Sequence, residues 1–175
     1  MLMKRIVGIV VGVVAAAGML LVSGCGTMRM GREEKLAEKL RVAERVQQQL
    51  DAREYTIEIN YMMPLRGAGR AITGDYTVIV SGDTVDSFLP YSGVARNVPY
   101  GGGKALIFKD KIIEYADSGF IKDRRTIVFR TDNGEDVLTY TLTIFDEGQA
   151  SVHVHSTNRD DISFRGELNP DAKKE

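Results

Sequence analysis

From residue 54 onward, apolar and polar residues alternate in short runs separated by turn-forming residues. In the first run, polar residues separate Tyr55, Ile57, Ile59 and Tyr61, which is the period of a strand with one buried face. The connections between later runs are short, and short connections join antiparallel neighbours. The pattern therefore predicts a mainly β domain, an antiparallel meander of about eight to nine strands that curls into a sandwich or an open barrel.

The predicted strands cover residues 55–61, 75–81, 84–89, 106–108, 112–116, 126–131, 137–145, 149–156 and 161–168. Residues 109–111 and 117–119 are predicted to be turns, because Lys, Asp, Ser and Gly are frequent there. Prolines and glycine runs predict irregular loops at residues 62–70 and 90–104.

An amphipathic helix is predicted ahead of the strands, at residues 31–53. This segment has no proline, and its apolar residues recur at three- and four-residue steps at Leu36, Leu40, Ala43, Val46 and Leu50. We expect this stripe to cover one face or end of the sheet. A spacer or a coiled-coil dimerisation seam are the alternatives.

The N-terminus reads as an export signal. Lys4 and Arg5 precede an apolar run at residues 6–22, and Ser23 and Gly24 lead to Cys25. This ending resembles the lipobox of bacterial lipoproteins, which implies cleavage before Cys25 and attachment of diacylglycerol to its thiol. The alternatives are a retained transmembrane anchor or an ordinary thiol beside a conventional cleavage site.

The predicted organisation is a signal peptide at 1–24, a lipidated tether at 25–30, the helix at 31–53, the β domain at 54–169 and a polar tail at 170–175. Two acyl chains would hold the protein stably on a membrane. Gly26 stands where an aspartate would imply inner-membrane retention, so the lipoprotein resemblance implies the outer membrane, and we expect its periplasmic face.

The net charge narrows the classes of partner that the protein can bind, and the cysteine content shows whether disulfides can stabilise it. The net charge is −1, and removal of residues 1–24 with two basic side chains leaves about −3, which disfavours a nucleic-acid partner. The expected partners are the membrane, through Cys25, and an envelope protein or glycan. Since Cys25 is the one cysteine of the chain, no disulfide is expected and stability must come from the core.

Several segments also carry a family resemblance. These are Asn-Tyr-Met-Met-Pro at 60–64, the stretch 83–91 ending in Phe-Leu-Pro-Tyr, Gly-Val-Ala at 93–95, Tyr-Gly-Gly-Gly at 100–103, and residues 158–166. From about Arg53 to Leu168 the chain resembles the domain of unknown function 4251 family, exported proteins of anaerobic Gram-negative gut bacteria. The family has no assigned activity, so the resemblance implies no catalytic residue.

His153 and His155 are the two histidines of the chain, and alternation places them on one face of a strand about 7 Å apart. Two imidazoles at that spacing can share a zinc ion, but a third ligand is required. The neighbouring strand offers mostly threonines, so we expect solvent-facing histidines, with a metal site as the alternative. No cofactor is predicted.

The two irregular loops supply a second candidate site. If they fall at one end of the sheet, arginines and tyrosines could form an amphipathic rim for a glycan, peptide or small anion. The residues of this predicted rim are Arg66, Arg70, Tyr91, Arg96 and Tyr100. The alternative is that these residues pack as structural corners.

No catalytic constellation is recognisable, so the chain is predicted not to be an enzyme. The glycines before Lys104 do not make a phosphate-binding loop, because Val98 and Ala105 replace required residues. The predicted function is that of a membrane-anchored binding or assembly module of the envelope. The alternatives are a small-molecule or glycan carrier with its ligand in a partly closed barrel and, third, a metal-dependent hydrolase using the two histidines.

Overall fold

The computed structural model describes residues 31–97 and 103–169. The chain divides into two compact units, Met1–Leu36 and Ala37–Glu175, and the second contains the entire sheet. The predicted signal peptide, Cys25 with its tether, and the tail at 170–175 lie outside the described residues. Within those residues, no helix has both the length and the apolar character needed to cross a membrane.

The predicted amphipathic helix is α2 (Arg32–Ala52). At its start, the backbone N–H of Gly31 donates to the carboxylate of Glu34 over 3.0 Å, a common helix-capping interaction. At its end, Arg53 takes a left-handed backbone conformation with φ of 52°. Val46 and Leu50 are fully buried in the core, so the second half of the stripe packs on the β domain. Leu36 and Leu40 in the first half are 60% and 58% exposed, so the prediction holds for only part of the stripe.

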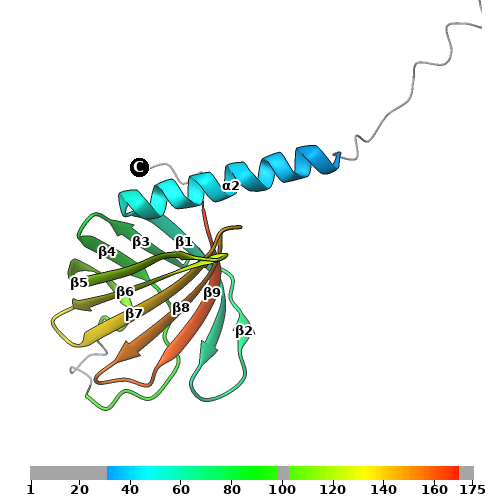
Figure 1. Cartoon of the computed structure of the whole chain (residues 1–175). Coiled ribbons are helices and arrows are strands. Elements are labelled where there is room, and N and C mark those ends of the chain that lie inside the picture. Colours follow the sequence, from blue (N-terminus) through cyan, green and yellow to red (C-terminus); the bar gives the residue numbers. More distant parts are fainter. Residues whose placement is uncertain (1–30, 98–102, 170–175) are drawn as a thin grey trace, which may run out of the picture. The chain divides into compact units, whose positions relative to one another are not determined.

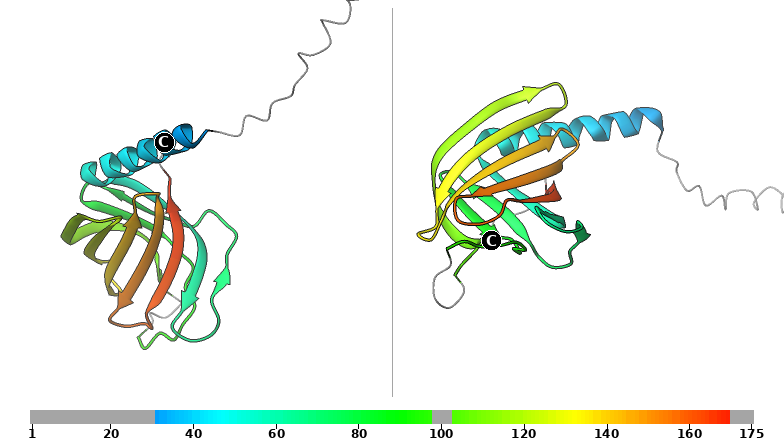
Figure 2. Two further views of the ribbon diagram at one scale, coloured as in Figure 1. Left: turned by 45° about the vertical axis from the view of Figure 1, so that its right-hand side comes forward. Right: turned by 90° about the horizontal axis from the view of Figure 1, so that it is seen from below.

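Nine strands follow α2 in the described residues, and they pair antiparallel in one sheet. They are β1 (Glu54–Pro64), β2 (Arg70–Ala71), β3 (Thr77–Ser81), β4 (Thr84–Phe88), β5 (Ile107–Ile121), β6 (Arg124–Asp132), β7 (Val137–Phe145), β8 (Gln149–Ser156) and β9 (Ile162–Leu168). Eight of them form a barrel, which closes because β9 pairs with β1 (Figure 1 and Figure 2). The short β2 pairs with β1 outside this ring. The predicted fold class is confirmed, and the sheet closes.

Two regions depart from the prediction. Residues 62–64, predicted to begin an irregular loop, belong to β1. The turns expected at residues 109–111 and 117–119 are wrong, because β5 runs unbroken through both. Lys109 and Lys111 point outward and lie opposite Asp86 and Thr84 of β4, so they continue the strand's alternation. At residues 117–120 the pairing with β6 is shifted by a bulge.

The interior of the barrel is filled by its own side chains. Tyr140 lies at the centre, with its ring stacked on Phe129 at 4.9 Å between centroids and edge-on to Phe108 at 6.5 Å. Its hydroxyl lies 2.9 Å from that of Ser87, which donates to the carbonyl of Leu106, so the buried polar atoms are paired. Burial raises the pKa of Tyr140, which keeps this hydroxyl protonated.

The closing seam between β1 and β9 contains a β-bulge. Ile59 lies opposite Gly166 and Tyr61 opposite Arg165, so Asn60 is the extra residue on β1. The carbonyl of Asn60 instead accepts from the N–H of Ile72 over 3.0 Å, in the segment that leads from β2 to β3. The bulge thus lets β1 pair with β9 on one side and with β2 and β3 on the other.

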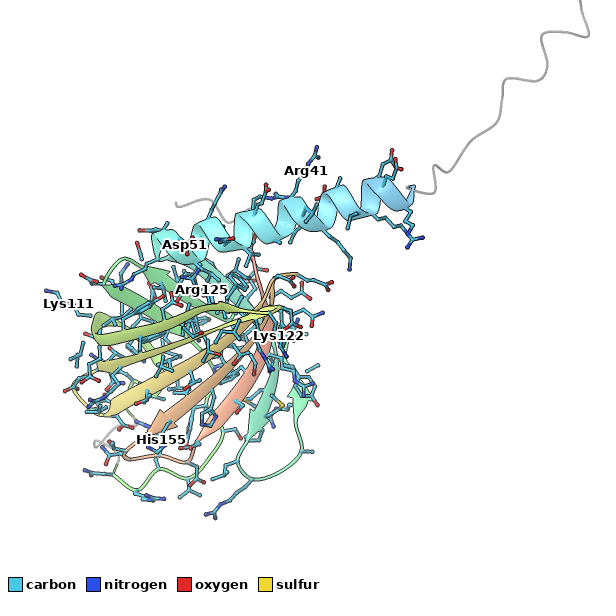
Figure 3. All side chains as sticks on the ribbon, viewed as in Figure 1. Arg41, Asp51, Lys111, Lys122, Arg125 and His155 are labelled. Atoms are coloured by element: carbon cyan, nitrogen blue, oxygen red, sulfur yellow. The ribbon has the colours of Figure 1, made fainter. Side chains whose placement is uncertain are left out.

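α2 is fastened to the barrel by a buried arginine. Arg125 of β6 donates to the carboxylate of Asp51 in α2 and to both carboxylate oxygens of Asp117 in β5, the latter at 2.8 and 3.1 Å from Nε (Figure 3). The Arg125 side chain is 8% exposed. Beside it, the guanidinium of Arg53 lies over the ring of Tyr115, 4.1 Å from its centroid.

Candidate functional site

The end of the barrel farther from these contacts is named the loop end, and in the described chain it consists of residues 65–69, 89–97, 103–106, 133–136 and 157–161. The described part of the loop 89–106 is joined to the β8–β9 turn by backbone pairing. The N–H of Arg96 donates to the carbonyl of Asn158 over 2.8 Å, and the N–H of Asp160 donates to the carbonyl of Val94 over 2.9 Å. Ala95 and Arg159 form an isolated β-bridge between them.

The predicted rim is brought together only in part. Arg66 Nε lies 3.5 Å from the carboxylate of Asp160, and the Tyr91 hydroxyl donates to the Asp160 carbonyl over 3.2 Å. Burial raises the pKa of Tyr91, so this hydroxyl stays a donor. Two members of the rim therefore meet on Asp160, which was not among the predicted residues.

The other three members of the rim do not join that contact. Arg70 lies in β2, where it is exposed and its backbone pairs with Met62. Arg96 is attached through its backbone, and its side chain is exposed. Tyr100 lies outside the described residues. The contacts that are seen hold loops in place, which is the structural-corner alternative.

The loop end also contains a buried polar network. The carboxylate of Asp136 accepts from the N–H of Thr157 over 3.1 Å, from the N–H of Asn158 over 3.2 Å and from the hydroxyls of Thr157 and Ser156. The side chain of Asn133 donates to the carbonyl of Ala105 over 3.1 Å and accepts from the backbone N–H groups of Glu135 and Asp136, each over 2.9 Å. The network ties Ala105 and the turn at residues 156–158 to the turn at residues 133–136.

Arg159 is buried in the same network, with 4% of its side chain exposed. Its guanidinium lies 3.5 Å from the carboxylate of Glu135, 3.8 Å from that of Asp136 and 5.7 Å from the ring centroid of Tyr91. In the sequence, Arg159 and these acidic residues look like ordinary turn residues, and no local signal marks them as buried.

The two histidines are exposed on the outer face of β8, as predicted. Figure 3 shows His155 close to the loop end. Their neighbour Asp161 was not predicted from the sequence. Its Oδ1 lies 2.8 Å from His155 Nδ1, and its Oδ2 lies 3.6 Å from His153 Nε2. In the described part of the chain, no group of three or more His, Cys, Asp and Glu side chains could hold a metal ion.

The outer wall carries an apolar area across β3, β4 and β5. Phe88 lies opposite Ile107 in the register of β4 and β5, and its ring stacks on Tyr76 at 5.7 Å between centroids. Ile79 of β3 is also exposed on this face, and it lies opposite Asp86, diagonal to Phe88 in the register of β3 with β4. We name these four residues the β3–β5 patch. Phe88 is 43% and Ile107 50% exposed, which is more than a core position allows.

A surface depression of about 350 Å³ adjoins the patch at Tyr76. Its lining includes three acidic side chains, those of Glu58, Asp75 and Glu167. A second depression of about 340 Å³ lies between β8, β9 and β1, beside Ser151 and Arg165. Both are lined largely by outward-facing residues of the wall.

No curated protein matches the chain. Among solved structures, it is similar to the crystal structure of a DUF4251 family protein from Bacteroides eggerthii DSM 20697. The two share 18% sequence identity with a TM-score of 0.57, and the match covers 77% of this chain and 91% of that one. This likeness shows the fold. The family model for the domain of unknown function DUF4251 matches residues 37–168, about three quarters of the sequence, so the chain belongs to the DUF4251 family.

Proposed function

We propose that this protein is an envelope lipoprotein, anchored to the outer membrane through Cys25, whose barrel binds a protein partner on its outer wall. The observation that carries the binding role is the exposed β3–β5 patch on a barrel with a filled interior. Exposed apolar groups that adjoin one another mark interaction surfaces more often than isolated ones do.

The filled interior favours this proposal over the carrier alternative. A carrier of the predicted kind needs space along the barrel axis, and that axis is occupied by fully buried side chains such as Tyr140, Phe129 and Phe164. Any ligand of this barrel is then more easily accommodated on the wall. Aromatic residues such as Tyr76 and Phe88 are also enriched where proteins bind other proteins.

The surroundings of the patch suggest what the partner offers. Lys109 and Asp86 form an ion pair at 3.6 Å beside Phe88, and the depression next to Tyr76 is acidic. A partner that presents an apolar side chain flanked by basic residues would complement both features.

The anchor and the binding surface are tested separately. Metabolic labelling with an alkyne fatty acid should tag the wild-type chain and leave Cys25→Ala unlabelled, and equal labelling of both would contradict the anchor. For the surface, a photo-crosslinking amino acid at residue 107 should give a discrete adduct in the native envelope.

Ile113 supplies the matched control, because it lies on the same strand and is 61% exposed outside the patch. The crosslinker at residue 113 should give no such adduct. The partner identified at residue 107 should bind the purified wild-type protein and fail to bind Phe88→Ser. Equal adducts at both positions, or unchanged binding by Phe88→Ser, would refute the surface.

A further inference from the structure

The second depression of the wall, of about 340 Å³, gathers polar side chains from three neighbouring strands. The register of β8 with β9 places Ser151 opposite Arg165 on its outer face, and Gln149 opposite Glu167. Asn60 joins them from β1, where it is the extra residue of the bulge, and bulges often re-aim a side chain beside a site. The volume falls in the range of roughly 300–1,000 Å³ that small-molecule sites occupy.

The polar side chains of this depression are not engaged by the protein itself. In the chain as described, the side chains of Asn60, Gln149, Ser151, Arg165 and Glu167 make no hydrogen bond or ion pair with another residue. At the loop end, in contrast, carboxylates and amides are occupied in holding turns together. A ligand in the depression would therefore meet donors and acceptors that only water contacts.

The backbone around the depression is already paired. The carbonyl of Asn60 accepts from Ile72, and β8, β9 and β1 form continuous ladders. A peptide that adds to a sheet as an extra strand needs an unpaired edge, and this seam offers none. Recognition at this site must therefore use side chains.

Arg165 sets the charge preference of the site. Its side chain is exposed, and its guanidinium carbon lies 5.9 Å from the ring centroid of Tyr61. Contact with an aromatic ring steadies a guanidinium while its N–H groups remain free to donate. A free guanidinium matches a carboxylate through two parallel N–H···O bonds.

The groups beside Arg165 favour hydroxyls on the rest of the ligand. Glu167 lies two residues along the same face, roughly 7 Å away, and its carboxylate accepts hydrogen bonds and repels a second anion. The amides of Asn60 and Gln149 both donate and accept, as sugar hydroxyls do. Phe145 completes the lining with a half-buried ring on which the C–H face of a sugar can pack.

We propose that this depression binds an acidic sugar, a hexuronic acid unit of a glycan, with its carboxylate on Arg165 and its hydroxyls towards the amides and Glu167. The site is separate from the β3–β5 patch proposed for a protein partner, so each can fail without the other.

The test uses the full-length chain in a polyoxyethylene detergent, which carries no sugar headgroup. Saturation-transfer NMR with methyl β-glucuronide should give saturable binding with a dissociation constant of about 1 mM, as expected for a ligand of this size. Methyl β-glucoside lacks the carboxylate, and N-acetyl-dialanine has a carboxylate without hydroxyls. Each should bind at least tenfold more weakly.

Variants locate the site. Arg165→Gln should weaken binding of the glucuronide roughly 10–100-fold, the range for loss of a hydrogen bond to a charged group, and Gln149→Ala roughly 2–10-fold. Arg96→Gln makes the same change of charge at the loop end and should leave the affinity unchanged. Circular dichroism establishes that each variant is folded. The proposal is overturned if the glucuronide shows no saturable binding, if the glucoside or N-acetyl-dialanine binds equally well, or if Arg96→Gln weakens binding as much as Arg165→Gln.

Discussion

Gly166 of β9 lies opposite Ile59 of β1, at the step of the barrel seam where β1 carries its extra residue. A Cβ atom built at position 166 would lie 1.9 Å from the carbonyl oxygen of Glu58. That oxygen belongs to the backbone, which cannot yield without disturbing the seam. The junction of the first and last strands therefore requires a residue without a side chain.

We expect Gly166→Ala to lower the free energy of unfolding by about 3 kcal/mol, the upper part of the range for overpacked sites. Urea unfolding followed by circular dichroism measures this. Gly31→Ala is the control, since a Cβ there has no neighbour within 4 Å and φ is not in the left-handed region. Equal stability of Gly166→Ala and the wild type would show that the seam can relax.

Replacing Arg125 should loosen α2 from the barrel. Arg125→Met leaves the partly buried carboxylate of Asp117 without its cation. We expect the free energy of unfolding to fall by about 2 kcal/mol. This is less than for a fully buried ion pair, because the second partner, Asp51, is half exposed. Amide hydrogen exchange should rise in the second half of α2. Arg130→Met removes a well-exposed pair with Glu114 and should cost less than about 1 kcal/mol. Similar losses in both variants would argue against the special role of Arg125.

The same site predicts a pH dependence below about pH 4. Burial acts to raise the pKa of Asp117, but the hydrogen bonds from Arg125 and from the N–H of Gly119 outweigh it and hold the pKa below its usual value. A lowered pKa in the folded state contributes stability that is present above the ordinary pKa and lost as the pH falls through the folded value. Wild type should thus exceed Asp117→Asn in stability at pH 6, and the difference should shrink towards pH 2. If urea unfolding shows a constant difference in stability over this pH range, the lowered pKa of Asp117 is not the origin of the pH dependence.

Asp160 should control the attachment of the 89–106 loop. Its carboxylate accepts from the N–H of Val94 over 3.2 Å while nearly buried. In Asp160→Ala that amide loses its acceptor, so we expect a loss of about 1–2 kcal/mol and faster hydrogen exchange at Val94 and Arg96. Asp160→Asn keeps an acceptor oxygen and should retain most of the protection. If both variants exchange alike, the ion pair with Arg66 rather than the hydrogen bond holds the loop.

The alternation of apolar and polar residues was sufficient to predict several strands of the barrel wall. The bounds predicted for β7 and β8 agree with the structure, because an uninterrupted two-residue period runs through residues 137–145 and 149–156. In β5 the same reasoning failed, since Lys109, Asp110 and Lys111 have the composition of a turn. Their place in a strand is decided by the neighbouring β4, which pairs with them.

Long-range pairing explains what the sequence could not predict. The contact of β1 with β9 joins residues about a hundred positions apart, and no local pattern distinguishes such a closed sheet from a sandwich. Likewise, the histidines could be placed on one face, but Asp161 could be found only from the register of β8 with β9. Arg159 and Asp136 belong to turns in sequence, and only the packing of the loop end shows that they are buried.

The seam between β1 and β9 also determines when during synthesis the barrel can close. β1 is synthesised first among the barrel strands and β9 last, so the ring has no complete wall until residue 168 is available. Until then β1 and β8 expose unpaired backbone edges, which invite association with other chains. Contacts between such distant segments also slow folding, because a long loop must close before they form. A chain truncated before Ile162 should therefore aggregate rather than persist as a smaller barrel.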